Sequence, residues 1–235
     1  MPRTGTDPTV TRIEPLRPRG LRVRLHLDRG DPFDVALEAL EKARLGVGDP
    51  LPDPARNRLL DADADVRVRD AALNLLSYRA RTRSELRRRL VAKDFRPARV
   101  DTCLDRLEER GLLDDRAVAA AFVRDRLRHR PRGPNRLAQE LRAKGVAGDV
   151  AGQVVEQVLA DEEVTEMDLA REVAEGWVAR QGDRLLEALV RSDRSPDAQK
   201  ARRRLHGYLA RRGFRGAALG RAMDVAAETA RTRPR

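Results

Sequence analysis

The chain has 235 residues, of which 37% are charged and only 3% are aromatic, and its formal net charge is +11. This composition favours an anionic partner such as nucleic acid and argues against a single deep core. Cys103 is the only cysteine, which excludes an internal disulfide, and no apolar run reaches the length of a membrane span or signal-peptide core. We therefore expect a cytoplasmic protein that does not enter a membrane.

The amino-terminal segment predicts a short tail followed by a small sheet. Residues 1–10 are rich in Thr, Pro, Gly and Asp, which is typical of a disordered tail. From residue 21 to residue 27, apolar and polar side chains alternate with a period of two, as in a half-buried strand. Thr11–Glu14 and Pro32–Val35 could pair with it. The sequence predicts a β-hairpin or a three-stranded meander.

The rest of this region, 11–65, predicts a short helix and a linker. Residues 36–45 have a helical pattern that ends at Gly46. The segment 46–65 contains three prolines within its first nine residues, and we interpret it as a linker.

Beyond residue 66, three copies of one basic segment share an apolar spacing of four and then five residues. The apolar positions are Leu86, Leu90 and Phe95, then Leu137, Leu141 and Val146, then Leu205, Leu209 and Phe214. Asp94, Gly145 and Gly213 precede the last apolar residue of each copy, and these residue types tolerate the left-handed backbone of a helix end. The repetition predicts a mainly α-helical protein built from tandem three-helix repeats, each with this segment as its second helix.

The first repeat is expected over residues 66–113. Its three helices are expected at 66–78, 83–93 and 97–110. Thr82 and Glu85 have the spacing of a capping box, Pro97 suits the first turn of the third helix, and Gly111 ends it.

The second repeat is expected over residues 114–163. Asp114 or Asp115 can cap its first helix, and Pro134 opens its second. The residues expected to face its core are Val118, Ala121 and Phe122.

The third repeat is expected over residues 164–235. Thr165 and Asp168 form another capping box, and an apolar stripe follows at Leu169, Val173 and Trp177. The distance between equivalent leucines grows from 51 residues in the first step to 68 in the second. We expect an insertion near 181–197.

Charge is partitioned along each repeat. The net charge is +7 over 79–99, +6 over 124–144 and +7 over 200–215, whereas 149–168 contains seven acids and no base. A helix turns by 100° per residue, which places Arg88 opposite the apolar stripe and Arg87 beside it. The same geometry exposes Arg142, Arg203 and Arg211. If the repeats stack in register, these cations form a basic stripe.

Candidate sites for chemistry fail on spacing. Asp61, Asp63 and Asp65 resemble the start of an EF-hand loop, but Val66 occupies the place of the turn glycine. The three histidines have no metal-ligand spacing with one another or with the cysteine. We therefore expect no catalytic residues, no metal and no cofactor.

Several motifs resemble the RecX family of bacterial recombination regulators. They are SYRARTRSELRRRL at 77–90, GLLDD at 111–115, Phe122-Val123, the run 133–145 that ends in QELRAKG, and the amino-terminal stretches TRIEPL, LRVRLHLD and GVGDPL. The resemblance covers about residues 11 to 160. It implies tandem three-helix units in an elongated, curved body, and the third unit is the weaker match.

The resemblance also implies a function. RecX proteins modulate, and usually inhibit, the RecA recombinase by lodging in the groove of its filament on DNA, and they can bind single- and double-stranded DNA directly. We expect such binding to be weakly sequence-selective, and we expect a monomer. The candidate filament- or DNA-binding residues are Arg79, Arg81, Arg83, Arg87, Arg88, Arg128, Arg130, Arg132, Arg136, Arg142, Arg203 and Arg211.

An alternative interpretation is a helix-turn-helix transcription regulator, since three short helices can place a recognition helix in the major groove. Repetition argues against this, because a reader of one site needs one such helix per half-site.

Overall fold

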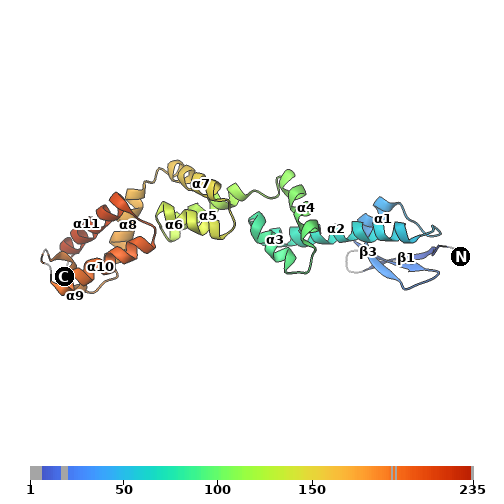
Figure 1. Ribbon diagram of the computed structural model, residues 1–235, viewed down its shortest axis with the longest axis horizontal. Helices are drawn as coiled ribbons and strands as arrows, with labels where there is room; N and C mark the ends of the chain where they lie inside the picture. Colours follow the sequence, from blue (N-terminus) through green and yellow to red (C-terminus); the bar gives the residue numbers. More distant parts are fainter. Residues whose placement is uncertain (1–6, 17–20, 192, 194, 234–235) are drawn as a thin grey trace. The chain divides into compact units, whose positions relative to one another are not determined.

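The computed structural model describes residues 7–16, 21–191, 193 and 195–233. In these ranges a small sheet is followed by helices throughout (Figure 1), so the prediction of a mainly α-helical fold is confirmed. The chain divides into two compact units. One holds the residues up to Ala80 and Leu86–Leu113, and the other holds Arg81–Glu85 and Asp114–Arg235. None of the described helices carries an apolar stretch that could cross a membrane.

Of the two predicted forms, a β-hairpin and a three-stranded meander, the structure shows the meander. Strands β1 (Val10–Leu16), β2 (Arg22–Leu27) and β3 (Phe33–Ala36) pair antiparallel in chain order. Val23 lies opposite Val35, and both are buried with Leu25 against the helices that follow. Alternation in β2 therefore separates a core face from a solvent face.

The predicted disordered tail is wrong at its carboxyl end. Val10 is fully buried and begins β1, and the Thr9 N–H donates to the Asp28 carboxylate at 2.8 Å. Residues 1–6 lie outside the described part of the chain.

The predicted linker is wrong from Asp53 onward. After α1 (Leu37–Ala43), a 26-residue helix, α2, runs from Asp53 to Tyr78. Two of the three prolines that suggested a linker, Pro52 and Pro54, instead start this helix, because a proline in the first turn gives up no intrahelical hydrogen bond. The buried Asp63 side chain accepts from the Ala36 N–H at 2.7 Å and so ties α2 to the end of β3.

The carboxyl half of α2 continues into the first helical cluster with α3 (Arg83–Val91) and α4 (Pro97–Glu109). The two helices after α2 begin where the sequence predicts. Leu86 and Leu90 are fully buried against Val68 of α2 and Leu104 of α4. Gly111 follows α4 with a φ of +68°.

The second cluster contains α5 (Asp115–His129), α6 (Pro134–Ala143) and α7 (Gly148–Asp161). Asp114 caps α5 by accepting from the Ala117 N–H at 2.9 Å. The predicted core face of α5 is shifted by one residue. Ala119 and Val123 are buried, whereas the predicted core residues Val118 and Phe122 are partly buried and Ala121 is exposed. All seven residues from 117 to 123 are apolar, so periodicity does not fix the buried face.

The third cluster contains α8 (Glu166–Val178), α9 (Asp183–Val190), α10 (Pro196–Arg211) and α11 (Gly216–Thr232). The capping box of Thr165 and Asp168 is confirmed, and Trp177 is buried as predicted. The predicted three-helix repeat needs a correction here. The insertion near 181–197 forms α9, whose Leu186 and Leu189 enter the same core.

Two left-handed glycines lie at close contacts within the second compact unit. Gly213, with a φ of +93°, packs against Arg136, and the Gly133 N–H donates to the Arg212 carbonyl at 2.8 Å. Gly145, with a φ of +87°, packs in the same way against Ser84. A β-carbon at either glycine would be strained by its backbone and would collide with its neighbour.

The variant Gly213→Ala tests this packing. Its β-carbon would lie 2.6 Å from the Arg136 backbone nitrogen, so we expect a loss of at least about 2 kcal/mol, measured as a lower midpoint of urea unfolding. The matched control is Gly220→Ala in α11, where nothing lies within 4 Å, and it should gain about 0.5–1 kcal/mol. Equal midpoints for the two variants would contradict this account.

Candidate nucleic-acid interface

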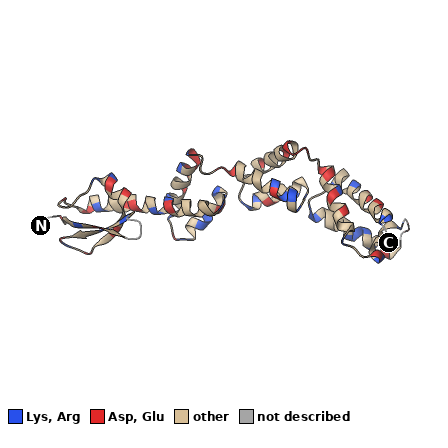
Figure 2. Cartoon of the chain, turned by 180° about the vertical axis from the view of Figure 1, so that it is seen from behind, with Lys and Arg blue, Asp and Glu red and all other residues tan. Residues whose placement is uncertain are grey.

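Helices α3, α6 and α10 carry the repeated basic segment and are called the second helices, although α9 precedes α10 in its cluster. Each has arginines on the face opposite its buried leucines. Figure 2 shows cations gathered on these helices and acids along α7. Six predicted arginines are exposed, and in the described ranges their side chains have no hydrogen bond or ion pair. These are Arg88, Arg128, Arg130, Arg142, Arg203 and Arg211. They can bind an anion without first breaking a native contact.

Two other predicted arginines are exposed but already engaged. Arg87 forms a two-pronged contact with Asp101, at 2.6 and 3.1 Å, and this carboxylate raises the pKa of the Arg87 guanidinium. Arg79 donates to the Ala80 carbonyl at 3.0 Å. Asp101 neutralises Arg87, so an incoming phosphate would have to compete with it.

Arg81 is not on the surface, in contrast to the prediction. Its side chain is 8% exposed, and its Nη1 lies 2.7 Å from Glu85 Oε1. The neighbouring Thr82 hydroxyl accepts from the Glu85 N–H at 3.2 Å and donates to the Lys144 carbonyl at 2.7 Å. Arg83 is half-buried, and its N–H donates to Asp115. These contacts hold the start of α3 in place, so Arg81 and its neighbours have a structural role there.

Arg132 and Arg136 converge on one half-buried carboxylate, that of Glu140. Their nitrogens each lie 3.1 Å from Oε1, and Arg126, which the sequence did not single out, lies 3.2 Å from Oε2. Arg126 also stacks over Phe122, with 4.4 Å between the guanidinium carbon and the ring centroid. Arg126 also contacts the Asp125 carboxylate at 3.0 Å, so three guanidinium groups face two carboxylates and the cluster keeps an excess of one positive charge.

Arg204 and Arg215 were also missed as single residues. Both are exposed, and in the described ranges neither side chain has a hydrogen bond or ion pair. The net charge of 200–215 was the signal that could have found them.

Acidic residues of the second cluster lie mainly on α7 and just after it. Asp161 and Glu162 both accept from Arg124 of α5, at 3.3 and 2.8 Å. Helix α7 itself contains three acids and no base. Within this cluster, negative charge is therefore concentrated on α7 and just after it, whereas α6 contains a single acid, Glu140.

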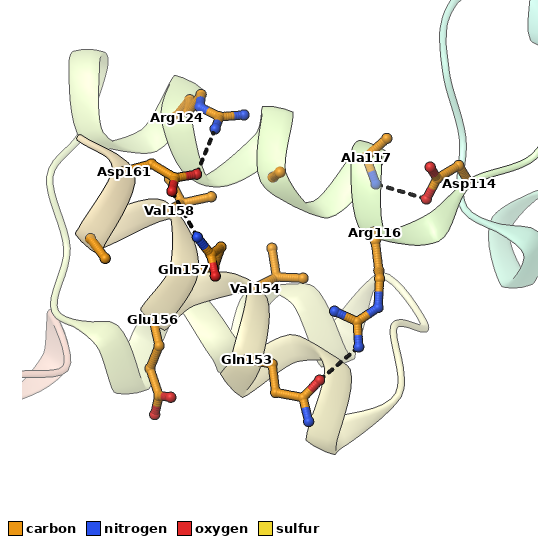
Figure 3. A pocket seen from close by; sticks show the side chains of 12 residues that line it. Asp114, Arg116, Ala117, Arg124, Gln153, Val154, Glu156, Gln157, Val158 and Asp161 are labelled. Atoms are coloured by element: carbon orange, nitrogen blue, oxygen red, sulfur yellow. Dashed lines mark hydrogen bonds and ion pairs between the residues drawn. The ribbon is translucent and has the colours of Figure 1, made fainter.

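A hollow between α5 and α7 shows no arrangement for catalysis (Figure 3). Its polar groups bond mainly to one another, as in the contacts of Arg116 with Gln153 at 2.6 Å and of Gln157 with Asp161 at 2.7 Å. Among the described residues, no group of three or more His, Cys, Asp or Glu side chains could hold a metal ion. The acids of the EF-hand-like run are engaged elsewhere: Asp61 and Asp65 bind Arg99, and Asp63 binds Ala36.

Comparison with known proteins identifies the family. The model of the first RecX three-helix domain matches residues 69–107, and that of the second matches 114–155. Regulatory protein RecX of Corynebacterium efficiens is 39% identical over 177 residues, which cover 74% of this chain and 78% of that protein. The chain belongs to the RecX family. The RecX protein of Halorhodospira halophila is 42% identical over 147 residues, which cover 63% of this chain and 80% of that protein.

A solved RecX structure extends the likeness to the carboxyl-terminal part. The crystal structure of a regulatory protein RecX matches with a TM-score of 0.70 and 25% identity, and covers 92% of this chain and 99% of that chain. The matches to the two RecX domain models end at residues 107 and 155, both before α8. The third cluster is therefore related to RecX through the fold more than through the domain models.

The structural role of Arg81 can be tested by Arg81→Met. This change removes the buried ion pair between Arg81 and Glu85, and we expect a loss of about 3 kcal/mol in unfolding free energy. The double variant Arg81→Met/Glu85→Met should recover much of it. The exposed Arg88→Met should stay within about 0.5 kcal/mol of the parent. If Arg81→Met unfolds like the parent in urea, this ion pair does not support α3.

Proposed function

We propose that the chain is a regulator, mainly negative, of the RecA recombinase. It binds in the groove of the RecA–DNA filament and limits filament growth, ATP hydrolysis and strand exchange in recombination, DNA repair and the SOS response. Membership of the RecX family is the observation that carries this proposal. The action is non-enzymatic, and it depends on contact along the exposed arginines rather than on a reacting group.

The unpaired arginines support an interaction with DNA or with an acidic protein surface. A guanidinium group binds phosphate or carboxylate oxygens through two parallel hydrogen bonds. Each phosphate contact releases counterions, so binding to DNA weakens as salt rises and depends little on sequence. The exposed side chains of Arg88, Arg142 and Arg203 lie on three different second helices, which suits a long partner.

A site-specific transcription regulator is less well supported. Such a protein reads base edges with one recognition helix per half-site. Here, the exposed cations recur on helices of three clusters. This distribution favours contact with a repetitive partner over contact with one short DNA sequence.

Action on the filament can be measured through RecA ATP hydrolysis on single-stranded DNA. We expect inhibition when this protein is added well below one copy per RecA subunit, because blocking filament growth affects many subunits. A DNA-binding control at the same salt measures how much DNA the protein covers. Inhibition that begins only when the DNA is saturated would contradict filament regulation and indicate competition for DNA.

The exposed arginines can be tested with the triple variant Arg88→Ala/Arg142→Ala/Arg203→Ala. Each phosphate contact contributes about 0.7 to the slope of log K against log salt for single strands, so the slope should fall by about two. RecA inhibition should weaken with it.

The matched control removes three exposed arginines outside the second helices, Arg58, Arg67 and Arg184. It should keep the parent's salt slope and its inhibition. An equal loss in both triple variants would show that net charge, rather than the second helices, determines binding.

A further inference from the structure

The first compact unit contains a cavity lined by residues of α1, α2 and α4. Its volume is about 220 Å³, and residues of these three helices, together with Arg110 at the end of α4, line it. Five cations and two carboxylates line it, and no aromatic ring does. The cavity shares no residue with the arginines assigned to the second helices.

The inner charges of this cavity are paired. Arg69 lies 2.7 Å from Glu38 and 3.0 Å from Asp70, and Arg99 binds both Asp61 and Asp65. These contacts fix the cavity wall and leave its carboxylates occupied. Arg69 lowers the pKa of the Glu38 carboxyl group, so this acid stays ionised well below neutral pH.

Three further cations lie at the exposed side of the cavity: Lys42 from α1, and Arg106 and Arg110 from the last turn and end of α4. Their side chains are exposed, and they have no hydrogen bond or ion pair among residues 7–16, 21–191, 193 and 195–233. Two helices thus direct three cations to one small cavity, where Lys42 and Arg110 are also attracted by the Glu38 carboxylate. The lining holds five cations and two carboxylates, so an anion that entered would reduce the repulsion among the cations.

We propose that this cavity binds a phosphate group through Lys42, Arg106 and Arg110. Guanidinium and ammonium groups together match the charge and the several acceptor oxygens of a phosphate better than those of a single carboxylate. The volume is below the roughly 300–1,000 Å³ of sites for drug-sized ligands, so a phosphate or diphosphate fits and a whole nucleotide does not. The phosphate belongs either to a free compound or to a nucleic-acid backbone at the cavity mouth.

Cys103 offers a built-in reporter of occupancy. It lines the cavity, it is 8% exposed, and it is the only cysteine of the chain. Burial raises the pKa of its thiol, so alkylation is slow at neutral pH and depends on access through the cavity. A phosphate bound at the mouth therefore slows alkylation by a neutral reagent such as iodoacetamide.

The test uses inorganic pyrophosphate as the probe, in calorimetric titration of the full chain at constant ionic strength. The variant Lys42→Ala/Arg106→Ala/Arg110→Ala should bind at least about tenfold more weakly than the parent, because each charged contact contributes more than a neutral hydrogen bond. Pyrophosphate should slow Cys103 alkylation in the parent and not in this variant. The control Arg58→Ala/Arg67→Ala/Lys93→Ala removes the same charge from exposed residues of the same unit and should behave as the parent.

A second arm distinguishes the two sources with a labelled single-stranded oligonucleotide. Weaker DNA binding by the cavity variant, with pyrophosphate competing in the parent, would support the site and assign it to a nucleic-acid backbone. Unchanged DNA binding together with lost pyrophosphate binding would support the site and assign it to a free phosphate compound. Equal pyrophosphate binding by the two triple variants, or no pyrophosphate binding by the parent, would overturn the proposal. Neither outcome depends on any effect on RecA, so failure here leaves the proposed function standing.

Discussion

The packing of the second compact unit depends on a left-handed turn after each second helix. At Gly213 and Gly145 the chain reverses so tightly that the next residue, Phe214 or Val146, returns to the core. The absence of a side chain also lets a neighbouring segment approach, which permits the hydrogen bonds from Gly133 to Arg212 and from Thr82 to Lys144. Backbone groups that would otherwise be unsatisfied at a helix end are thereby paired with another segment. One constraint on φ thus ends a helix and joins two parts of the chain.

This arrangement separates two tasks on the same short helices. The start and end of α6 and the end of α10 take part in packing between segments, and the leucines of both helices fill the cores. The remaining face needs no partner within the protein, and exposed arginines such as Arg142 and Arg203 lie there. Charges that would be costly in a core are placed where water or an anionic partner can solvate them. Arg81 illustrates the opposite case, since its position before α3 requires a buried carboxylate beside it.

The sequence predicted features that depend on local spacing and missed those that depend on tertiary contacts. The repeated leucines, the Thr165 cap and the meander follow from periodicity and turn chemistry, and all are present. The start of α2 was missed because proline is common both in linkers and in the first turn of a helix. The contact of Asp63 with the end of β3, which favours the helix, is a tertiary contact that the sequence does not reveal. Burial of Arg81 depends on its pairing with Glu85 and likewise could not be predicted from the sequence. The exposed arginines follow from helix geometry, but their pairing, as for Arg87 with Asp101, does not.

The length of α2 affects how the amino-terminal unit can move. At 1.5 Å per residue its 26 residues span about 39 Å, and its two halves contribute to different cores, Leu59 to that of the sheet and Val68 to that of the first helical cluster. A flexible linker would let the sheet reorient freely at little energetic cost. A continuous helix has no such hinge, so a force or displacement at the sheet is transmitted to the first cluster as rotation of one stiff rod. In this unit, a partner that displaces the sheet would therefore also displace the helices packed against the carboxyl half of α2.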